Sequence, residues 1–152
     1  MKKIVLLVLL AGGAVWGWRA YTASRAFGAY QGFADAWAKE DRVKAEGFAS
    51  SQDVVKHAFD ERALRGTRGG AAMEAFRGTS YELESRTGQT NGDVRLVVMQ
   101  TIRFDPPGRT TGIGGAAWAK FRDEATVTKT ANGWRVTAFE PTFVDVGEIR
   151  RR

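Results

Sequence analysis

The chain has 152 residues, enough for one domain with a hydrophobic core but too few for two domains of ordinary size. Hydrophobic residues make up 43% and charged residues 26%, which is a globular rather than a disordered balance. There is no Cys and a single His, His57. A disulfide scaffold, a thiolate metal site, a cysteine nucleophile and a multi-histidine metal site are therefore excluded. We expect neither a bound metal nor a cofactor.

The net charge of +6 is carried by the two ends of the chain. Residues 1–25 contain four basic residues and no acid, and a basic tail, residues 147–152, ends in three Arg. The stretch 26–149 has 16 basic and 17 acidic residues. A domain that binds nucleic acid through its phosphates needs a basic face of its own, so we expect no nucleic-acid partner. Basic ends beside an apolar segment are typical of charges at a membrane surface.

An uncharged run, residues 4–18, follows Met1-Lys2-Lys3 and is either a cleaved signal peptide or an uncleaved membrane anchor. Small residues at 12–14 could serve as a cleavage site. Trp16 and Trp18, however, lie where an interfacial aromatic belt belongs. We favour the anchor, in which membrane lipid surrounds residues 4–18. The protein is then a single-pass protein of the inner (cytoplasmic) membrane, with its domain on the extracytoplasmic, periplasmic side. Secretion after cleavage is the alternative.

Within the same run, Gly13 and Gly17 form a G-x-x-x-G pattern, which lets two transmembrane helices approach closely. A homodimer through this pattern is one candidate partnership. The alternative is that small residues are simply common in such segments.

The first part of the body, residues 26–146, is predicted to be helical. Apolar residues at spacings of three and four predict an amphipathic helix whose face is Phe27, Tyr30, Phe33, Ala34, Trp37 and Ala38. A break near Asp41 predicts a second, short helix, because Asp is a favoured N-cap. That helix would carry Val43 and Phe48.

The stretch 53–59 is compatible with two structures. Val54, Val55, Ala58 and Phe59 suit one face of a helix, whereas Val55, His57 and Phe59 alternate as in a strand. A Gly-rich loop at 65–70 follows, and residues 71–76 then predict a short helix that Gly78 ends.

From residue 80 the apolar pattern changes to period two, which predicts strands. Turns at Asn91-Gly92 and Asn132-Gly133 are strong hairpin signals. They separate predicted strands from residue 80 onward and at 94–104, 116–129 and 134–139, with Pro141 bending the last strand or marking an edge. Helices followed by a four-stranded antiparallel meander predict an α+β domain with the amphipathic helix across one curved sheet face.

This order of elements resembles the nuclear-transport-factor-2-like superfamily, a cone-shaped fold shared with SnoaL-like proteins and ketosteroid isomerases. The resemblance is carried by the opening helix 33–41, the segment 53–57 before a Gly-rich loop, and the meander that closes on residues 133–136. It covers about residues 26–146 and is one of pattern. Members of the superfamily include isomerases, cyclases and many non-catalytic binding and assembly domains. A membrane helix directly before such a cone is also similar to assembly proteins of type IV secretion systems.

Two polar residues fall on inward strand positions. Gln100 shares a face with Val98 and Ile102, and a buried amide needs partners that a ligand or the protein itself could supply. Asp123 shares a face with Phe121. The resemblance implies that an inward carboxyl there polarises a substrate, because burial keeps it protonated. A shift of one residue would instead place Asp123 in water.

The remaining pocket candidates are His57, Tyr30, Trp37 and Trp118. His57 is the single His of the chain. The resemblance implies that it faces the cavity if its segment is a strand, and a helix would leave it on the surface. The three aromatic residues either line a pocket or form ordinary core. No general base can be placed opposite these groups, so no catalytic residue is assigned.

These observations favour a membrane-anchored extracytoplasmic domain that binds an apolar small ligand or a protein partner without catalysis. The alternative is a small isomerase- or cyclase-type enzyme with its active site inside the cone. The interior distinguishes the two hypotheses. Two or more mutually bonded acid–base groups there favour catalysis, and a collapsed apolar interior favours a scaffold.

Overall fold

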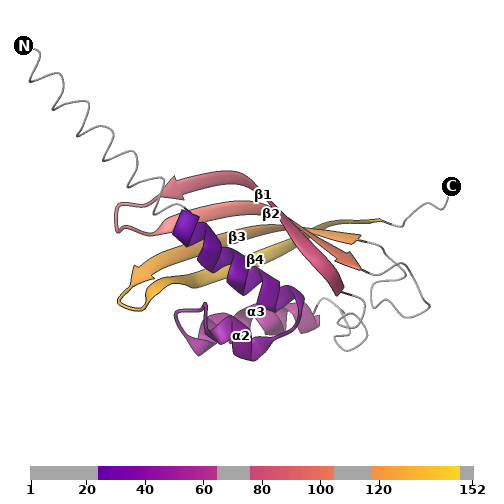
Figure 1. The fold of residues 1–152 in the computed structure, drawn as a ribbon, viewed down its shortest axis with the longest axis horizontal. Helices are drawn as coiled ribbons and strands as arrows, with labels where there is room; N and C mark the ends of the chain where they lie inside the picture. The colour runs from indigo at the N-terminus through magenta and orange to yellow at the C-terminus, as the bar shows by residue number, and fades with distance from the viewer. Residues whose placement is uncertain (1–23, 65–75, 105–117, 148–152) are drawn as a thin grey trace, which may run out of the picture.

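The computed structural model describes residues 24–64, 76–104 and 118–147 (Figure 1). The expected anchor at 4–18, the Gly-rich loop at 65–70 and the Arg-rich end of the tail lie outside these residues. Between Ser24 and Gly147, no described helix has the length and hydrophobicity needed to cross a membrane.

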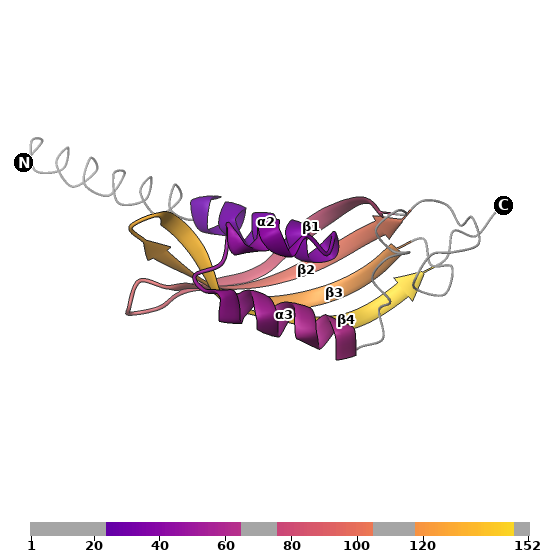
Figure 2. The same ribbon diagram turned by 90° about the horizontal axis from the view of Figure 1, so that it is seen from below.

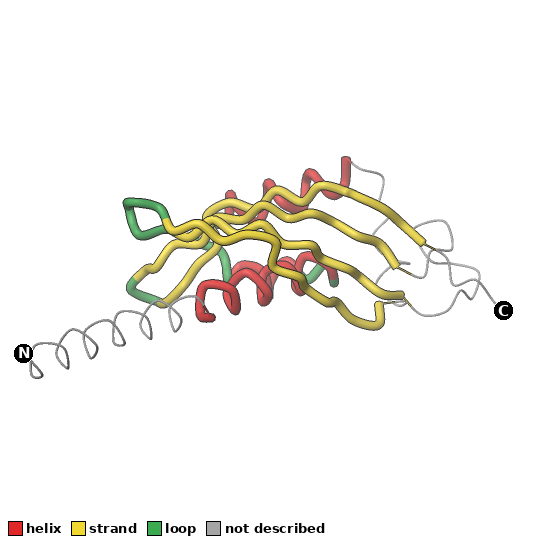
Figure 3. Tube along the Cα trace, turned by 90° about the horizontal axis from the view of Figure 1, so that it is seen from above, coloured by secondary structure: helices red, strands yellow, loops and turns green. Residues whose placement is uncertain are grey.

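The predicted α+β class is confirmed. A leading helix (residues 24–38) is followed by α2 (Arg42–Glu46) and α3 (Gln52–Leu64). Four strands then form one antiparallel sheet in the order β1-β2-β3-β4. Their bounds are Phe76–Gly88, Val94–Phe104, Trp118–Thr130 and Gly133–Gly147. Figures 2 and 3 show a curved sheet with all the described helices on one face.

Both predicted hairpin turns are present. Gly92 has a φ of 88° and Gly133 a φ of 96°, values that place both residues in the left-handed region where a side chain would be strained. The first turn is closed by a hydrogen bond from the Gln89 amide to the Asp93 carbonyl at 2.8 Å. Because the strands run alternately in opposite directions, the two turns lie at the same end of the sheet (Figure 3).

The predicted start of the second helix at Asp41 is confirmed. The Asp41 side chain accepts a hydrogen bond from the Lys44 amide at 2.9 Å and so caps α2, although Phe48 lies beyond that helix. The ambiguous stretch 53–59 lies within α3 and is helical. Between α2 and α3 the chain runs beside the start of β4, where Phe48 and Ser50 exchange backbone hydrogen bonds with Val136. These bonds hold the helices along that edge of the sheet.

The prediction of a helix over 71–76 ended by Gly78 is wrong at its C-terminal end, since Phe76 and Gly78 belong to β1. Phe76 pairs with Phe104 and packs against the core, so sheet pairing outweighs the local helical pattern. Gly78 follows a register shift in the strand instead of ending a helix.

The last strand is longer than the predicted 134–139. It continues through Pro141 to Gly147, and it forms an edge of the sheet. Proline is compatible with an edge strand because one side of the strand needs no hydrogen bonds within the sheet.

The core lies between the leading helix and the face of the sheet that it covers. Burial alternates along β2 and β3, so that every second side chain points toward the helix. The predicted apolar face of the leading helix is buried apart from Phe27, which packs partly against the core. Gly32 allows close approach, because a Cβ at this position would collide with the Phe48 ring. The largest aromatic residues meet at Phe139, whose ring centroid lies 5.1 Å from that of Phe33 and 5.5 Å from that of Trp37.

We expect Phe139→Ala to lower the free energy of unfolding by about 3–5 kcal/mol, because it leaves a cavity among these rings. Phe143 lies on the same strand but is 47% exposed. Phe143→Ala is therefore the matched control and should cost less than about 1 kcal/mol. Urea denaturation of both variants measures the difference. Equal losses would show that the core is not centred on Phe139.

Candidate functional site

Asp123 lies at the centre of the covered face. Its cross-strand partners are Val98 on β2 and Pro141 on β4, and its side chain is fully buried. Tyr30, from the leading helix, is equally buried and donates a hydrogen bond from its hydroxyl to Asp123 Oδ2 at 2.6 Å. A carboxyl and a phenol from distant parts of the chain thus form one bonded pair inside the domain.

The electrostatics of this pair follow from burial. Removal from water raises the pKa of Asp123 from 3.8 to about 7, although the hydrogen bond from Tyr30 opposes that rise. Burial, followed by the nearby Asp123 carboxylate, raises the pKa of Tyr30 far above its ordinary value. Tyr30 therefore remains a hydrogen-bond donor, and Asp123 is the group that exchanges a proton near neutral pH.

Gln100 lies on the same face and is also fully buried. Its Nε2 donates a long hydrogen bond of 3.3 Å to the Ala34 carbonyl of the leading helix. Within the described residues, Gln100 Oε1, Asp123 Oδ1 and Thr79 Oγ1 are buried without a hydrogen-bond partner. Such unsatisfied groups are costly, about 1–3 kcal/mol each, so this region is polar at the expense of stability.

Tyr81 and Asp35 extend the buried polar cluster of Tyr30, Gln100 and Asp123, and neither of them was predicted from the sequence. Tyr81 is the cross-strand partner of Gln100, and its hydroxyl donates to Asp35 Oδ1 at 2.8 Å. Burial, followed by the hydrogen bond to Asp35, raises the pKa of Tyr81. The Tyr30 and Tyr81 rings meet edge to face at 5.7 Å. Asp35 lies on the polar side of the predicted helix, and only the strand register would have revealed that Tyr81 faces it.

The two Trp candidates, Trp37 and Trp118, lie in different parts of the fold. Trp37 is core: its indole Nε1 donates to the Ala58 carbonyl at 3.0 Å, and its ring packs against Phe121 at 5.3 Å. Trp118 lies on the opposite face of the sheet from Asp123, because side chains alternate along β3. Its ring covers Gly147 and contacts the Lys120 ammonium at 5.3 Å. Trp118 therefore does not join the other candidates.

His57 also stands apart. As expected for a helical segment, it lies on the surface, where its side chain is 54% exposed and Nε2 lies 3.0 Å from Glu140 Oε1. It borders a shallow depression of about 240 Å³ on α3, together with Asp53, Lys56 and Asp60. In the part of the chain that the structure describes, no group of three or more acidic or His side chains could hold a metal ion.

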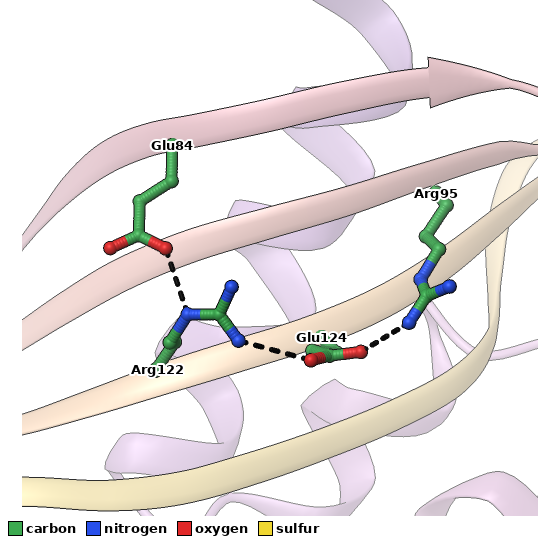
Figure 4. Close-up of polar contacts among 4 residues, drawn as sticks. All are labelled: Glu84, Arg95, Arg122 and Glu124. Atoms are coloured by element: carbon green, nitrogen blue, oxygen red, sulfur yellow. Dashed lines mark hydrogen bonds and ion pairs between the residues drawn. The ribbon is translucent and has the colours of Figure 1, made fainter.

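The uncovered face of the sheet carries a line of ion pairs across three strands (Figure 4). Arg122 Nε donates to Glu84 at 2.9 Å, and Arg122 Nη1 donates to Glu124 at 3.0 Å. Arg95 donates to the other oxygen of Glu124, which Figure 4 shows between the two guanidinium groups. Arg95, and then Arg122, hold the pKa of Glu124 below its ordinary value. Exposed ion pairs of this kind contribute little to stability, about 0–1 kcal/mol each.

A larger hollow, the hairpin groove, lies at the end of the sheet where both turns project. It has a volume of about 840 Å³ and is lined by Arg86, Gly88, Gln89, Asn91, Gly92, Asp93, Val94, Thr128, Lys129 and Trp134. None of these residues belongs to the buried polar cluster. The depression on α3 does not reach that cluster either.

The chemistry available inside is therefore limited by access. Asp123 can exchange a proton and Tyr30 can donate a hydrogen bond, but Tyr30, Gln100 and Asp123 are all fully buried. A substrate atom could reach Asp123 Oδ1 only if the leading helix moved away from the sheet. Comparison of the chain with protein-family models, curated proteins and solved structures finds no match.

We expect the stability of the protein to depend on pH through Asp123. Since its pKa in the folded state, about 7, lies above the ordinary 3.8, the folded state binds more protons between these values. The free energy of unfolding should therefore fall as pH rises from about 4 to about 7. The full difference corresponds to roughly 4 kcal/mol. Asp123→Asn should remove this fall.

Urea denaturation at intervals from pH 4.5 to 8 measures the effect. The exposed Asp145→Asn variant is the control and should follow the wild type. If Asp123→Asn and the wild type lost stability in parallel across this range, another group would carry the pH dependence.

Proposed function

We propose that this chain is a membrane-anchored, non-catalytic interaction domain that works on the extracytoplasmic side of the membrane. One observation carries the non-catalytic part of the proposal: the interior is filled. The leading helix lies on the covered face of the sheet, where Phe33, Trp37 and Phe139 pack ring against ring. The inward polar side chains are fully buried beside them. A domain with such an interior acts through its surface.

The anchored part of the proposal rests on the sequence. The uncharged run at 4–18, preceded by two Lys and ending in Trp16 and Trp18, has the composition of a membrane segment with an interfacial belt. The leading helix is already formed at residue 24, so little chain separates this segment from the domain. A helix across one curved antiparallel sheet also supports the resemblance to the nuclear-transport-factor-2-like cone, which we propose as the fold family.

A second candidate function is a small isomerase- or cyclase-type enzyme, and the Tyr30–Asp123 pair is the observation that favours it. A buried carboxyl with a pKa near 7, bonded to a phenol and left with one unpartnered oxygen, suits proton transfer or the polarisation of a carbonyl. This function would need a state in which a ligand reaches Asp123 Oδ1.

Cell fractionation tests the proposed location. The full chain, produced in bacteria, should remain in the membrane pellet after a carbonate wash, and N-terminal sequencing should begin at Met1. In spheroplasts, external protease should degrade the domain. Val8→Arg places a charge in the middle of the apolar run and should weaken retention, because an arginine there is costly in a bilayer. A soluble product that begins near Val15 would show that the segment is a cleaved signal peptide and that the domain is secreted.

A further inference from the structure

The end of the domain that carries both hairpin turns must lie close to the segment at residues 4–18. Figures 1 and 2 both show the start of the leading helix at the same end of the molecule as the two turns. Only residues 19–23 separate Trp18 from Ser24, a link that reaches about 20 Å at most even when fully extended. If residues 4–18 are held in a membrane, this end of the domain therefore faces the membrane surface.

This end is basic, whereas the rest of the body is acidic. The two hairpin segments, residues 86–95 and 128–135, contain four basic residues and one acid. The remainder of 26–149 contains 12 basic and 16 acidic residues. Arg95 is paired with Glu124 on the uncovered face, so with Glu124 counted beside it the hairpin end carries a net charge of +2 and the rest of the body −3. A surface of this kind is attracted to anionic lipid headgroups.

The one acidic side chain within the two hairpin segments, that of Asp93, is held by hydrogen bonds within the protein. Asp93 accepts a hydrogen bond from the Thr128 hydroxyl at 2.7 Å and another from Asn91 Nδ2 at 2.8 Å. These bonds join the first turn to β3, which fixes the two hairpins relative to each other. The carboxylate is thereby turned toward protein donors, while Arg86 and Lys129 line the groove between the hairpins.

Trp134 adds an aromatic residue of the type enriched at membrane interfaces. It is partly buried and lines the hairpin groove. The neighbouring Arg135 donates from Nη1 to the Trp134 carbonyl at 3.1 Å, which keeps this guanidinium beside the second turn. The groove, of about 840 Å³, thus combines an indole with the cationic side chains of Arg86 and Lys129, and this lining suits a phospholipid headgroup.

We propose that the hairpin end, residues 86–95 and 128–135, docks on the anionic phospholipid headgroups of the membrane that holds residues 4–18. Arg86, Lys129 and Arg135 contact lipid phosphates at and around the hairpin groove. This inference rests on the proposed anchor, and it adds a defined orientation of the domain on the membrane. The anchor alone would tether the domain without setting its orientation.

The test uses the full chain, which lacks Cys and so accepts single labels. Asn132→Cys places a fluorophore on the second turn. Ser80→Cys, an exposed position on β1, places it about 26 Å from the hairpin end of that strand. Each labelled protein is inserted into vesicles of phosphatidylcholine, alone or with 30% phosphatidylglycerol, that contain a headgroup-linked quencher. With phosphatidylglycerol, we expect the label at 132 to be quenched at least threefold more than the label at 80. Most of that difference should disappear in 0.5 M salt, because salt screens exposed charges.

Charge reversal identifies the residues that dock. Arg86→Glu, Lys129→Glu and Arg135→Glu combined should remove the extra quenching at 132, and Lys129→Glu alone should reduce it. The matched control reverses three exposed basic residues elsewhere, Lys44, Arg77 and Arg103, with the same change in net charge. It should leave the quenching at 132 intact. Circular dichroism checks that each variant is folded.

Vesicle flotation separates failure of this inference from failure of the anchor. If the chain floats with the vesicles but the labels at 132 and 80 are quenched equally, the docking proposal is wrong and the anchor stands. Equal quenching at 132 with and without phosphatidylglycerol would overturn the role of anionic headgroups. A chain that does not float with any vesicles would overturn both proposals.

Discussion

The hydrogen bond between Tyr30 and Asp123 joins the leading helix to the middle of the sheet. It is made between two fully buried side chains, so loss of either partner leaves the other as a buried polar group without this hydrogen bond. The same helix also accepts the Gln100 amide at Ala34, and the Tyr81 hydroxyl at Asp35. Three polar contacts, one from each of β1, β2 and β3, and one stripe of apolar side chains therefore fix one position of the helix on the sheet.

The fixed position of the leading helix on the sheet determines whether the interior of the fold has room for a ligand. A curved sheet with helices on one face could enclose a cavity, and the polar cluster would be a plausible lining for it. Here the rings around Phe139 and the leading helix fill that space. Burial raises the pKa of Asp123, and the same burial keeps its side chain away from any substrate at the surface. The filled interior is the basis of the proposed interaction domain, and the bonded Tyr30–Asp123 pair is the basis of the enzymatic alternative.

Local signals in the sequence predicted most of the sheet. Asn-Gly pairs define both turns because the glycines need a positive φ, and alternation along 94–104 gives the correct strand. The same alternation places Gln100 and Asp123 on the covered face. The sequence predicts a helix over 71–76 that Gly78 ends, because the strand that Phe76 and Gly78 actually form depends on partners about 25 residues away, at Phe104 and Arg103. Non-local pairing of this kind leaves little trace in a local pattern.

The candidate site was only partly predictable, for the same reason. Parity along a strand identifies inward residues but not what faces them, so the bonds from Tyr30 to Asp123 and from Tyr81 to Asp35 required the tertiary structure. Parity alone could have excluded Trp118, which lies five residues before Asp123 on the same strand and so on the other face. The location of His57 depended on whether its segment was a helix or a strand, and as part of α3 it lies at the surface.

The surface is organised by charge in two different ways. On the uncovered face, Glu84, Arg122, Glu124 and Arg95 alternate in sign and neutralise one another. At the hairpin end, three basic residues, Arg86, Lys129 and Arg135, lie outside this network, and the Asp93 carboxylate is bonded inward. A balanced network cancels its own charge, whereas an unbalanced basic end attracts anions.

The most direct test of a filled interior is Gln100→Leu. If Gln100 is a polar group within packed core, leucine removes a buried oxygen that has no partner among the described residues. The free energy of unfolding should then stay unchanged or rise by about 1 kcal/mol. Native mass spectrometry should show the wild type and the variant at the masses of their own chains. A small molecule that is bound to the wild type and lost from a folded Gln100→Leu variant would contradict the account, because the interior would then be a binding site.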